Sequence, residues 1–492
     1  MNRIVIEPQR VLGTIDRNIF GGFAEHLGRC IYGGIYDPGS SFADEQGFRT
    51  DVIAALRRLE MPVVRYPGGN FVSGYRWRDG VGPASERPSR TDLAWHDAES
   101  NRFGTNEFMS FCRKLNAEPY LVVNCGDGDM REARDWVEYC NGTGDSALAK
   151  MRREHGFLPP HGVKYWGIGN EVDGHWQIGY KSPQEYARAF TEFGKVMKWV
   201  DPGIKLVASA VSHWDGEFVE RAQLLLEQAG DLIDYLALHW YVGNPNRDFA
   251  AYMAVSELLE DRLAAFEGLI GAVRLQRGIK KPIRIAVDEW NVWYRTHPRY
   301  GGIPSENKLE EVYNLEDALV TAIQLNAFIR HARSVRMANI AQIVNVIAPV
   351  FTRPDGLVLQ TIFFPFEVYS RTCGDLALDV WWDGDTFSGG DHIALRTLDV
   401  SATVDEDRKR IALYVVNRSQ SQEMETVMSL TSGEFKGQGM SYTVNGPDIK
   451  AENTFASPLN VQTRETVVIA SGQTLRYVFE PHSLTALVFD IV

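Results

Sequence analysis

Two acidic side chains stand where an ionisable group is unusual, shortly after apolar segments. Glu171 follows the apolar segment 163–168, and Glu289 follows the apolar segment 283–287. A buried segment fixes the backbone beside it and limits the solvation of the carboxylate. Two carboxylates that flank one bond are what cleavage of a glycosidic bond requires, because one donates a proton to the departing oxygen while the other attacks the anomeric carbon or directs water to it.

The elements that must position these carboxylates repeat in a regular order. Short segments rich in Val, Ile and Tyr alternate with longer segments of helical period, which is typical of β/α units on a parallel sheet. One helix is expected to begin at Ser182, with a proline at its first position and Glu185 completing a capping box. Eight strands with helices between them predict a closed (β/α)8 TIM barrel. The expected strands span residues 19–24, 63–66, 119–124, 163–168, 205–210, 235–239, 283–287 and 339–346.

The pattern changes at about residue 385, where strand-like segments separated by turn clusters replace the helices. We therefore expect the barrel to occupy residues 16–384 and an all-β, jelly-roll-like sandwich to occupy residues 385–492. Residues 1–15 contain a strand that precedes the barrel, and we expect this strand to join the sandwich.

Composition argues against several classes of partner. The chain has 492 residues and a formal charge of −13, which disfavours nucleic acid and anionic membranes because both require clustered Lys and Arg. The first residues lack a secretory pattern, and no apolar run approaches the roughly 20 residues that span a bilayer. A cytoplasmic location is expected. The five cysteines are widely spaced without a C-x-x-C motif, so free thiols are expected rather than disulfides or a zinc site.

In a barrel of this kind, chemistry lies at the carboxyl ends of the strands. Strands four and seven face one another across the mouth, so Glu171 and Glu289 can point at one central volume. Alternation along a strand places Asp288 on the opposite face from Glu289. Alternation would also separate Asn170 from Glu171, unless the strand ends or bulges before them.

Six blocks of sequence follow one another in a characteristic order: "GGFAEHLGRCIYGGIYDPGS", "RYPGGNFVSGYRWRDGVGP", "WGIGNEVDG", "LHWYVGN", "DEWNVWY" and "AQIVNVIAP". Together they resemble glycoside hydrolase family 51, the α-L-arabinofuranosidases, over roughly residues 20–370. The resemblance implies a retaining, exo-acting enzyme that removes terminal arabinofuranosyl groups without a metal or an organic cofactor. Its implied partners are arabinofuranosyl-containing oligosaccharides, such as arabinoxylan or arabinan fragments, and further copies of the chain in a homo-oligomer, typically a hexamer.

The resemblance also assigns roles to individual residues. It makes Glu171 the general acid/base and Glu289 the nucleophile. Glu171 must begin protonated, so we expect the negative charges of Glu25 and Glu289 to raise its pKa. Tyr241 is expected to donate a hydrogen bond to Glu289 and keep it ionised. The residues expected around the sugar are Glu25, Asn70, Asn170, Tyr241, Gln342, Trp95 and Trp176.

Other interpretations of these side chains remain open. Glu25 could pair with Arg29 or Arg65 instead of contacting sugar, and Arg65 itself is expected to support a carboxylate. Trp95 and Trp176 could be ordinary packing residues.

Other functions also remain open. A single histidine such as His239 or His175 lacks the spacing of a metal site, so no metal is expected. An endo-glucanase or a β-xylosidase on a related barrel would use the same two carboxylates. A carbohydrate-binding protein without turnover would keep the aromatic walls. Selectivity for the leaving group is expected to lie in loops such as 296–314.

Overall fold

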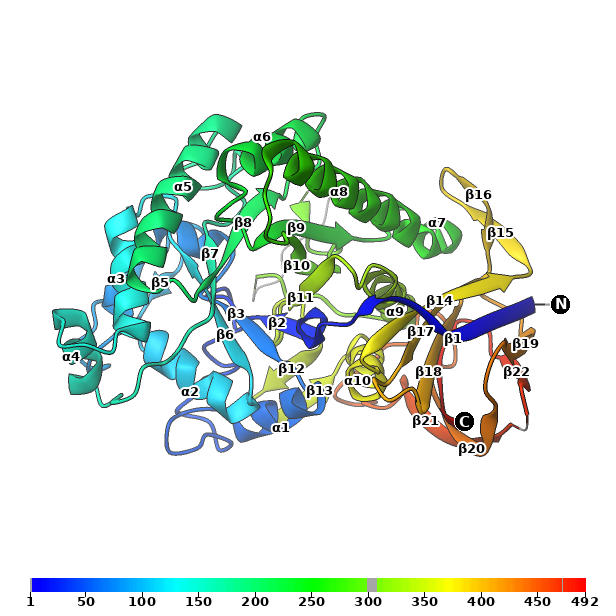
Figure 1. The fold of residues 1–492 in the computed structure, drawn as a ribbon. Helices are drawn as coiled ribbons and strands as arrows, with labels where there is room; N and C mark the ends of the chain where they lie inside the picture. The colour runs from blue at the N-terminus through cyan, green and yellow to red at the C-terminus, as the bar shows by residue number, and fades with distance from the viewer. Residues whose placement is uncertain (1, 299–307, 471) are drawn as a thin grey trace.

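The computed structural model describes residues 2–298, 308–470 and 472–492 of the chain. Its larger part is a closed barrel of eight parallel strands in the order β10-β11-β2-β3-β6-β7-β8-β9 (Figure 1). This arrangement confirms the predicted (β/α)8 barrel. The barrel strands are β2 (Gly21–Phe23), β3 (Val63–Tyr66), β6 (Glu118–Val123), β7 (Tyr165–Ile168), β8 (Lys205–Val211), β9 (Tyr235–Val242), β10 (Arg284–Val292) and β11 (Val335–Ala341).

Amphipathic helices cover the outside of the barrel. Helix α5 begins as the sequence predicts, because the Ser182 side chain accepts a hydrogen bond from the Glu185 backbone N–H and Pro183 occupies the first turn. The helices are α1 (Thr50–Arg58), α2 (Thr105–Leu115), α3 (Met130–Asn141), α4 (Ala147–Glu154), α5 (Pro183–Val200), α6 (Phe218–Ala229), α7 (Phe249–Met253), α8 (Val255–Arg277), α9 (Leu315–Arg330) and α10 (Phe363–Thr372). None of these described helices is long and apolar enough to cross a membrane.

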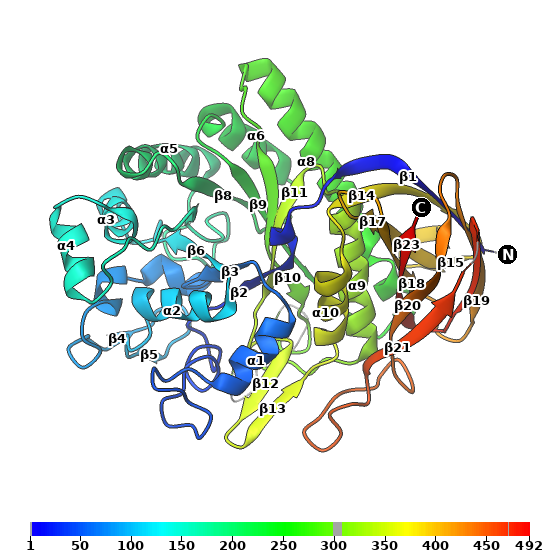
Figure 2. The same cartoon turned by 60° about the horizontal axis from the view of Figure 1, so that its bottom comes forward.

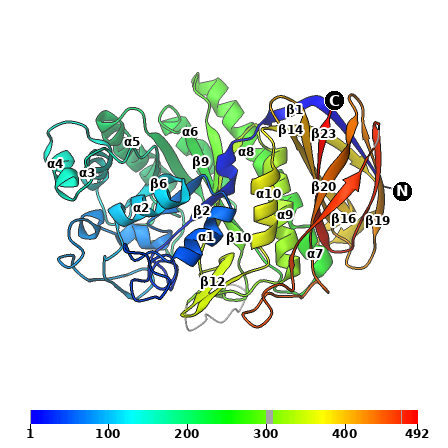
Figure 3. The same cartoon turned by 90° about the horizontal axis from the view of Figure 1, so that it is seen from below.

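Nearly the whole surface of helix α9 is buried, as is that of α10. It lies with α10 between the barrel and the C-terminal sheet, as two views of the molecule show (Figure 2, Figure 3). Most of its buried residues are apolar, and buried polar residues such as Asp317 and Asn326 are hydrogen-bonded. The two parts of the chain therefore share one continuous core through α9.

The C-terminal part is a sheet of nine strands in the order β21-β20-β23-β18-β17-β14-β1-β19-β22. It confirms the predicted β domain beside the barrel. Strand β1 lies between β14 and β19, although it comes first in the chain. A separate apolar core fills this domain and includes Ile4, Leu413 and Phe489. The strands are β1 (Asn2–Thr14), β14 (Leu376–Asp383), β17 (Leu398–Val404), β18 (Arg410–Asn417), β19 (Met424–Leu430), β20 (Phe435–Asn445), β21 (Gln462–Ile469), β22 (Thr474–Phe479) and β23 (Ser483–Ile491).

Smaller elements surround the barrel and the sheet. They comprise the hairpins β4 (Arg90–Thr91) with β5 (Ala98–Glu99), β12 (Val350–Arg353) with β13 (Gly356–Leu359), and β15 (Thr386–Gly389) with β16 (His392–Arg396), and the 3-10 helices η1 (Arg17–Phe20), η2 (Asn70–Gly74) and η3 (Trp77–Gly80). All five cysteines are free, and four of them are buried.

Several strand boundaries differ from those predicted. Strands β9 and β10 run three and five residues further than expected, to Val242 and Val292. Strand β11 begins at Val335, four residues before the expected start, and it ends at Ala341. Residues of the barrel mouth therefore lie within strands β9 and β10 rather than in the loops that follow them.

Candidate active site

Strand β7 ends before the polar pair that follows it. Its last residue is Ile168, and Gly169 then turns the chain with a φ of +77°. Asn170 and Glu171 lie beyond the strand, and Glu171 itself has a φ of +44°. Strand alternation no longer applies to these two residues, so both side chains reach the centre of the barrel mouth. The strand therefore ends before Asn170, as it must if Asn170 and Glu171 are both to face the barrel mouth.

Strand β10 places Glu289 opposite Glu171. Tyr241, in the neighbouring strand β9, donates its hydroxyl proton to Glu289 Oε2 over 2.8 Å. One carboxylate oxygen of Glu171 and one of Glu289 lie within 4.8 Å of each other. Carboxyl groups about 5 Å apart suit double displacement, whereas inverting enzymes need about 6.5–9.5 Å to seat a water.

His239 lies between the two carboxylates. Its Nδ1 is 2.9 Å from Glu171 Oε1 and 3.4 Å from Glu289 Oε2, and its Nε2 is 3.4 Å from Asp288 Oδ1. This position of His239 between the two carboxylates was not predicted from the sequence. A usable signal existed, because His239 and Tyr241 are two residues apart on one strand and therefore share a face.

The same three donors, Glu171, His239 and Glu289, are close enough together to surround a cation. Burial lowers the pKa of His239, but the negative charge of Glu289 and hydrogen bonds to Asp288 and Glu171 outweigh burial and raise it well above its ordinary value. A protonated imidazole has no lone pair for a metal. The geometry is therefore explained by hydrogen bonding around a charged histidine.

The charge on His239 corrects the expected protonation of Glu171. Burial raises the pKa of Glu171, but the hydrogen bond and positive charge of His239 outweigh burial, so this pKa lies below its ordinary value. The expectation of a raised pKa is wrong, because it counted the negative neighbours and missed the histidine.

Arg65 supports the opposite side of the cluster and is buried. Its Nη1 donates to Glu289 Oε1 over 2.5 Å, and its Nη2 donates to Asn170 Oδ1 over 2.6 Å. Its Nε lies 3.5 Å from Asp288 Oδ2. Asp288 therefore contacts the same arginine and histidine as Glu289. This arrangement departs from simple alternation because the pairing of β10 with β9 is irregular just before Glu289.

Glu25 occupies a second buried position beside the cluster. Its Oε1 accepts hydrogen bonds from Trp95 Nε1 over 2.9 Å and from the Phe71 backbone N–H over 3.1 Å. Its Oε2 accepts from Gln342 Nε2 over 2.9 Å. Burial and then the negative charge of Glu289 raise the pKa of Glu25 to about 8. Glu25 is therefore mainly protonated at neutral pH and can donate one hydrogen bond.

The space between these groups is kept open by Gly69. A Cβ atom at this position would lie 3.2 Å from Glu289 Oε1, 3.4 Å from Glu25 Oε2 and 3.5 Å from Asn170 Nδ2. Any side chain there would occupy the volume on which these three groups converge. Asn70 follows directly, half-buried, as the first residue of η2.

The two expected aromatic walls make hydrogen bonds to acidic groups. Trp176 is 52% exposed and donates its indole N–H to Glu171 Oε2 over 2.7 Å. Trp95 is partly buried and contacts Glu25 as described above. Arg29 pairs with Glu310, with Nε 2.7 Å from Oε1. Of the loop 296–314, residues 299–307 lie outside the described part of the chain.

Comparison with known proteins agrees with this geometry. The family "Alpha-L-arabinofuranosidase 1 domain" matches residues 55–256, and the family "Alpha-L-arabinofuranosidase C-terminal domain" matches residues 288–483. An intracellular exo-α-(1→5)-L-arabinofuranosidase of Halalkalibacterium halodurans is 40% identical over 88% of this chain and 87% of its own length.

Solved structures give the same result. An α-L-arabinofuranosidase of Thermotoga maritima, in complex with arabinose, superposes with a TM-score of 0.91 at 38% identity over the full length of both chains. A thermostable GH51 α-L-arabinofuranosidase of Thermotoga petrophila superposes with a TM-score of 0.91 at 38% identity, over 99% of this chain and 100% of its own. The chain thus belongs to the α-L-arabinofuranosidases of glycoside hydrolase family 51.

Proposed function

We propose that this protein is a retaining, exo-acting α-L-arabinofuranosidase that releases terminal, non-reducing arabinofuranosyl groups by double displacement. The observation that carries the proposal is the separation of at most 4.8 Å between oxygens of Glu171 and Glu289. The substrates are arabinose-containing oligo- and polysaccharides such as arabinoxylan or arabinan fragments. Membership of the family and the arabinose complex of a relative support this choice of sugar.

Glu289 acts as the nucleophile. Arg65 and Tyr241 each donate a hydrogen bond to it, which fixes the direction of the carboxylate. Glu171 acts as the acid and then as the base. His239, at 2.9 Å, supplies the proton that Glu171 passes to the departing oxygen. When the glycosyl-enzyme forms, Glu289 loses its charge, and Glu171 then activates water as a base.

The remaining side chains of the site hold the sugar. Asn170 binds the 2-hydroxyl, a contact that strengthens as positive charge develops at the anomeric carbon. Glu25 is protonated at neutral pH, so it donates a hydrogen bond to a sugar hydroxyl. The ionised carboxylates of the site have no proton to donate. Asn70, Tyr241 and Gln342 complete the polar contacts. Trp95 and Trp176 form the walls.

We propose further that the enzyme acts in the cytoplasm as a homo-oligomer, with a hexamer as the expected form. The intracellular relative supports the location. Sedimentation equilibrium of the purified protein tests the assembly, and a monomer at micromolar concentration would contradict it.

Release of nitrophenol from p-nitrophenyl α-L-arabinofuranoside tests the activity. We expect release from this substrate, with the α-anomer of arabinose appearing first by proton NMR, because two inversions retain configuration. A panel of arabinosylated oligosaccharides, together with glucan and β-xyloside substrates, tests the specificity. Hydrolysis of glucan interiors or β-xylosides without release of arabinose would contradict the proposal, as would binding without turnover.

Azide separates the roles of the two carboxylates. Glu289→Ala should lose at least about a thousandfold in kcat, and azide should restore part of it with formation of the β-azide. Glu171→Ala should affect poor leaving groups far more than activated aryl ones, and azide should then give the α-azide. Glu227→Ala, in a surface ion pair of α6, is the matched control and should keep full activity. Identical behaviour of the two active-site variants would refute the assigned roles.

A further inference from the structure

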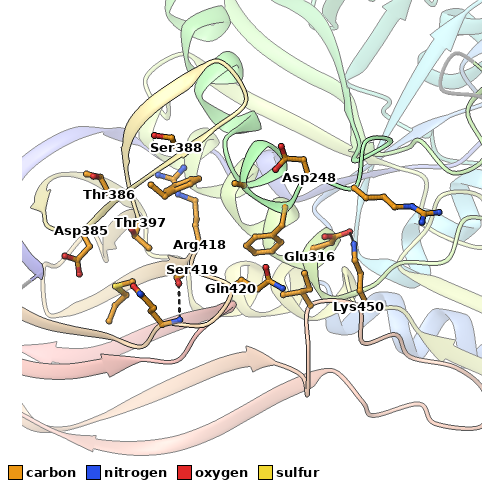
Figure 4. A pocket seen from close by; sticks show the side chains of 17 residues that line it. Asp248, Glu316, Asp385, Thr386, Ser388, Thr397, Arg418, Ser419, Gln420 and Lys450 are labelled. Carbon is orange, nitrogen blue, oxygen red and sulfur yellow. Dashed lines mark hydrogen bonds and ion pairs between the residues drawn. The ribbon is translucent and has the colours of Figure 1, made fainter.

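A cavity of about 690 Å³, away from the catalytic centre, lies where the barrel meets the β domain (Figure 4). Among the residues described, none of Glu171, His239 and Glu289 lines it. Its walls come from the loop after β9, from α7, from the start of α9, from the β15–β16 hairpin and from the turn between β18 and β19. The lining residues fall in segments 247–250, 385–388, 418–420 and 449–450, with Glu316, Thr397, Gln422 and Met424.

The walls of this cavity are fixed by close packing. Gly389, next to the lining residue Ser388, lies so close to α7 that a Cβ atom would stand 2.1 Å from the Ala250 carbonyl oxygen. The guanidinium carbon of Arg418 lies 5.0 Å from the centre of the Phe387 ring, and its Nη1 donates to the Met253 carbonyl oxygen over 3.3 Å. The hairpin, the helix and the turn are therefore held together by specific contacts.

The wall carries as many positive as negative side chains, namely Arg247, Arg418 and Lys450 against Asp248, Glu316 and Asp385. Lys450 forms an ion pair with the buried Glu316, and Arg418 Nη1 lies 3.3 Å from Glu257 Oε1. Asp248 caps α7 by accepting a hydrogen bond from a backbone N–H. Since these charges balance, the cavity offers little net attraction to an ion. A neutral ligand fits better.

The remaining lining groups combine aromatic rings with hydroxyls and amides. Phe249 and Phe387 contribute the rings, and Thr386, Ser388 and Gln420 contribute groups that donate and accept hydrogen bonds. A sugar has the matching character, because its C–H faces are apolar while its edge carries hydroxyls. Pockets that combine apolar walls with a few polar groups are typical ligand sites.

The cavity is connected to the catalytic centre by a short stretch of chain. Tyr241, which contacts Glu289, and Arg247, which lines the cavity, are six residues apart, so their Cα atoms lie at most about 20 Å apart. Asn244, within this stretch, donates to Glu316 Oε2 over 3.5 Å and anchors the loop to the wall. One oligosaccharide is long enough to reach both places.

We propose that this cavity is an accessory site for the neutral backbone of the oligosaccharide, at a distance from the bond that is cleaved. The proposal rests on the proposed function for the identity of the sugar. It predicts that long substrates gain affinity from the cavity, whereas an aryl arabinoside, which ends at the catalytic centre, gains none.

The test uses Gln420→Trp, which fills the cavity from its exposed edge, and Gln420→Ala, which removes the amide. Ile393→Ala is the matched control, because Ile393 lies on the same domain, is 81% exposed and does not line the cavity. With a long linear arabino-oligosaccharide, Gln420→Trp should raise KM about fivefold and Gln420→Ala less. KM for p-nitrophenyl α-L-arabinofuranoside should stay unchanged in all three. Equal losses on both substrates, or no loss on either, would overturn the accessory site.

Calorimetry gives an answer that does not depend on turnover. In a Glu289→Ala background, one oligosaccharide should bind per chain, and addition of Gln420→Trp should weaken this binding about fivefold. Equal affinity in both proteins would overturn the proposal, as would dissociation of an oligomer by Gln420→Trp, which would make the cavity a contact between copies. If the unmodified enzyme releases no nitrophenol, the proposed function fails, while the calorimetric result still decides the cavity.

Discussion

Arg65→Met is the change that tests most directly how the catalytic cluster is held. Arg65 is 1% exposed, and its guanidinium contacts Glu289, Asn170 and Asp288. Methionine keeps an unbranched side chain but loses the guanidinium, whose carbon lies 4.5 Å from the centre of the Phe23 ring. The substitution therefore removes a charge and its donors without opening a large cavity.

The expected loss of stability is large for one residue. Removing one partner of a buried ion pair typically costs about 3–5 kcal/mol, because the other partner remains buried without compensation. Here two carboxylates, Asp288 and Glu289, would be left with the cationic side chain of His239 as a shared neighbour. The unfolding free energy of an ordinary protein is only about 5–15 kcal/mol, so Arg65→Met should lower the midpoint of denaturation strongly.

The loss should depend on pH with a definite sign. Burial raises the pKa of Asp288, but the charge of Arg65 and contacts with His239 outweigh it, so this pKa lies below its ordinary value. A carboxyl group with a lowered folded pKa adds stability above its unfolded value, about 3.9, and loses it as the pH falls through the folded value. Without Arg65, burial would dominate and Asp288 would take up a proton more readily. The difference between the two proteins should therefore be greatest at neutral pH and shrink on acidification.

Guanidinium unfolding followed by tryptophan fluorescence, at several pH values, measures this difference. Arg10→Met is the control, because Arg10 pairs with Asp379 at the surface, where an ion pair is worth about 1 kcal/mol or less. If Arg65→Met unfolded within about 1 kcal/mol of the unmodified protein at pH 7, or if the difference grew on acidification, the reasoning would be refuted.

Three further changes test separate parts of the structure. Trp176→Phe removes one of the hydrogen bonds that outweigh burial and lower the pKa of Glu171. The basic limb of the pH profile of kcat/KM should therefore move to higher pH. A limb that does not move would argue against this contact in solution. Burial lowers the pKa of His331, but hydrogen bonds to two glutamates raise it to about 9. Its stabilising effect should therefore be complete below its unfolded pKa of about 6.5 and disappear as the pH rises through about 9, and His331→Gln should remove this dependence of the unfolding midpoint. Gly69→Ala places a methyl group 3.2 Å from Glu289 Oε1. The value of kcat/KM should fall about a hundredfold, with little change in the midpoint of unfolding. Full activity would show that the sugar does not use this space.

Much of the architecture could be predicted from local patterns. The alternation of apolar and helical segments predicts the eight-stranded barrel, and the change of pattern near residue 385 predicts the β domain. The positions of Glu171 and Glu289 after apolar segments predict two fixed carboxylates at one mouth. These signals are visible because periodicity and burial are properties of a few neighbouring residues.

The charge state of the site could not be predicted in the same way. Sequence reasoning counted Glu25 and Glu289 as neighbours of Glu171 and expected its pKa to be raised. The histidine that lowers it is 68 residues away in the chain, and only the barrel order β7-β8-β9 brings it to 2.9 Å. The boundaries of β9 and β10 and the irregular pairing that turns Asp288 toward Arg65 were equally invisible, because they depend on hydrogen bonds between strands.

The sequence by itself thus determined the class of fold, the family and the two carboxylates that we propose cleave the bond, since each follows from residue order along the chain. The tertiary structure decided that His239 lowers the pKa of Glu171, that Arg65 contacts Glu289, and that a cavity away from these carboxylates opens beside α7. Coulomb energies and desolvation depend on distances through space of a few ångströms, and the chain order of this protein does not contain those distances.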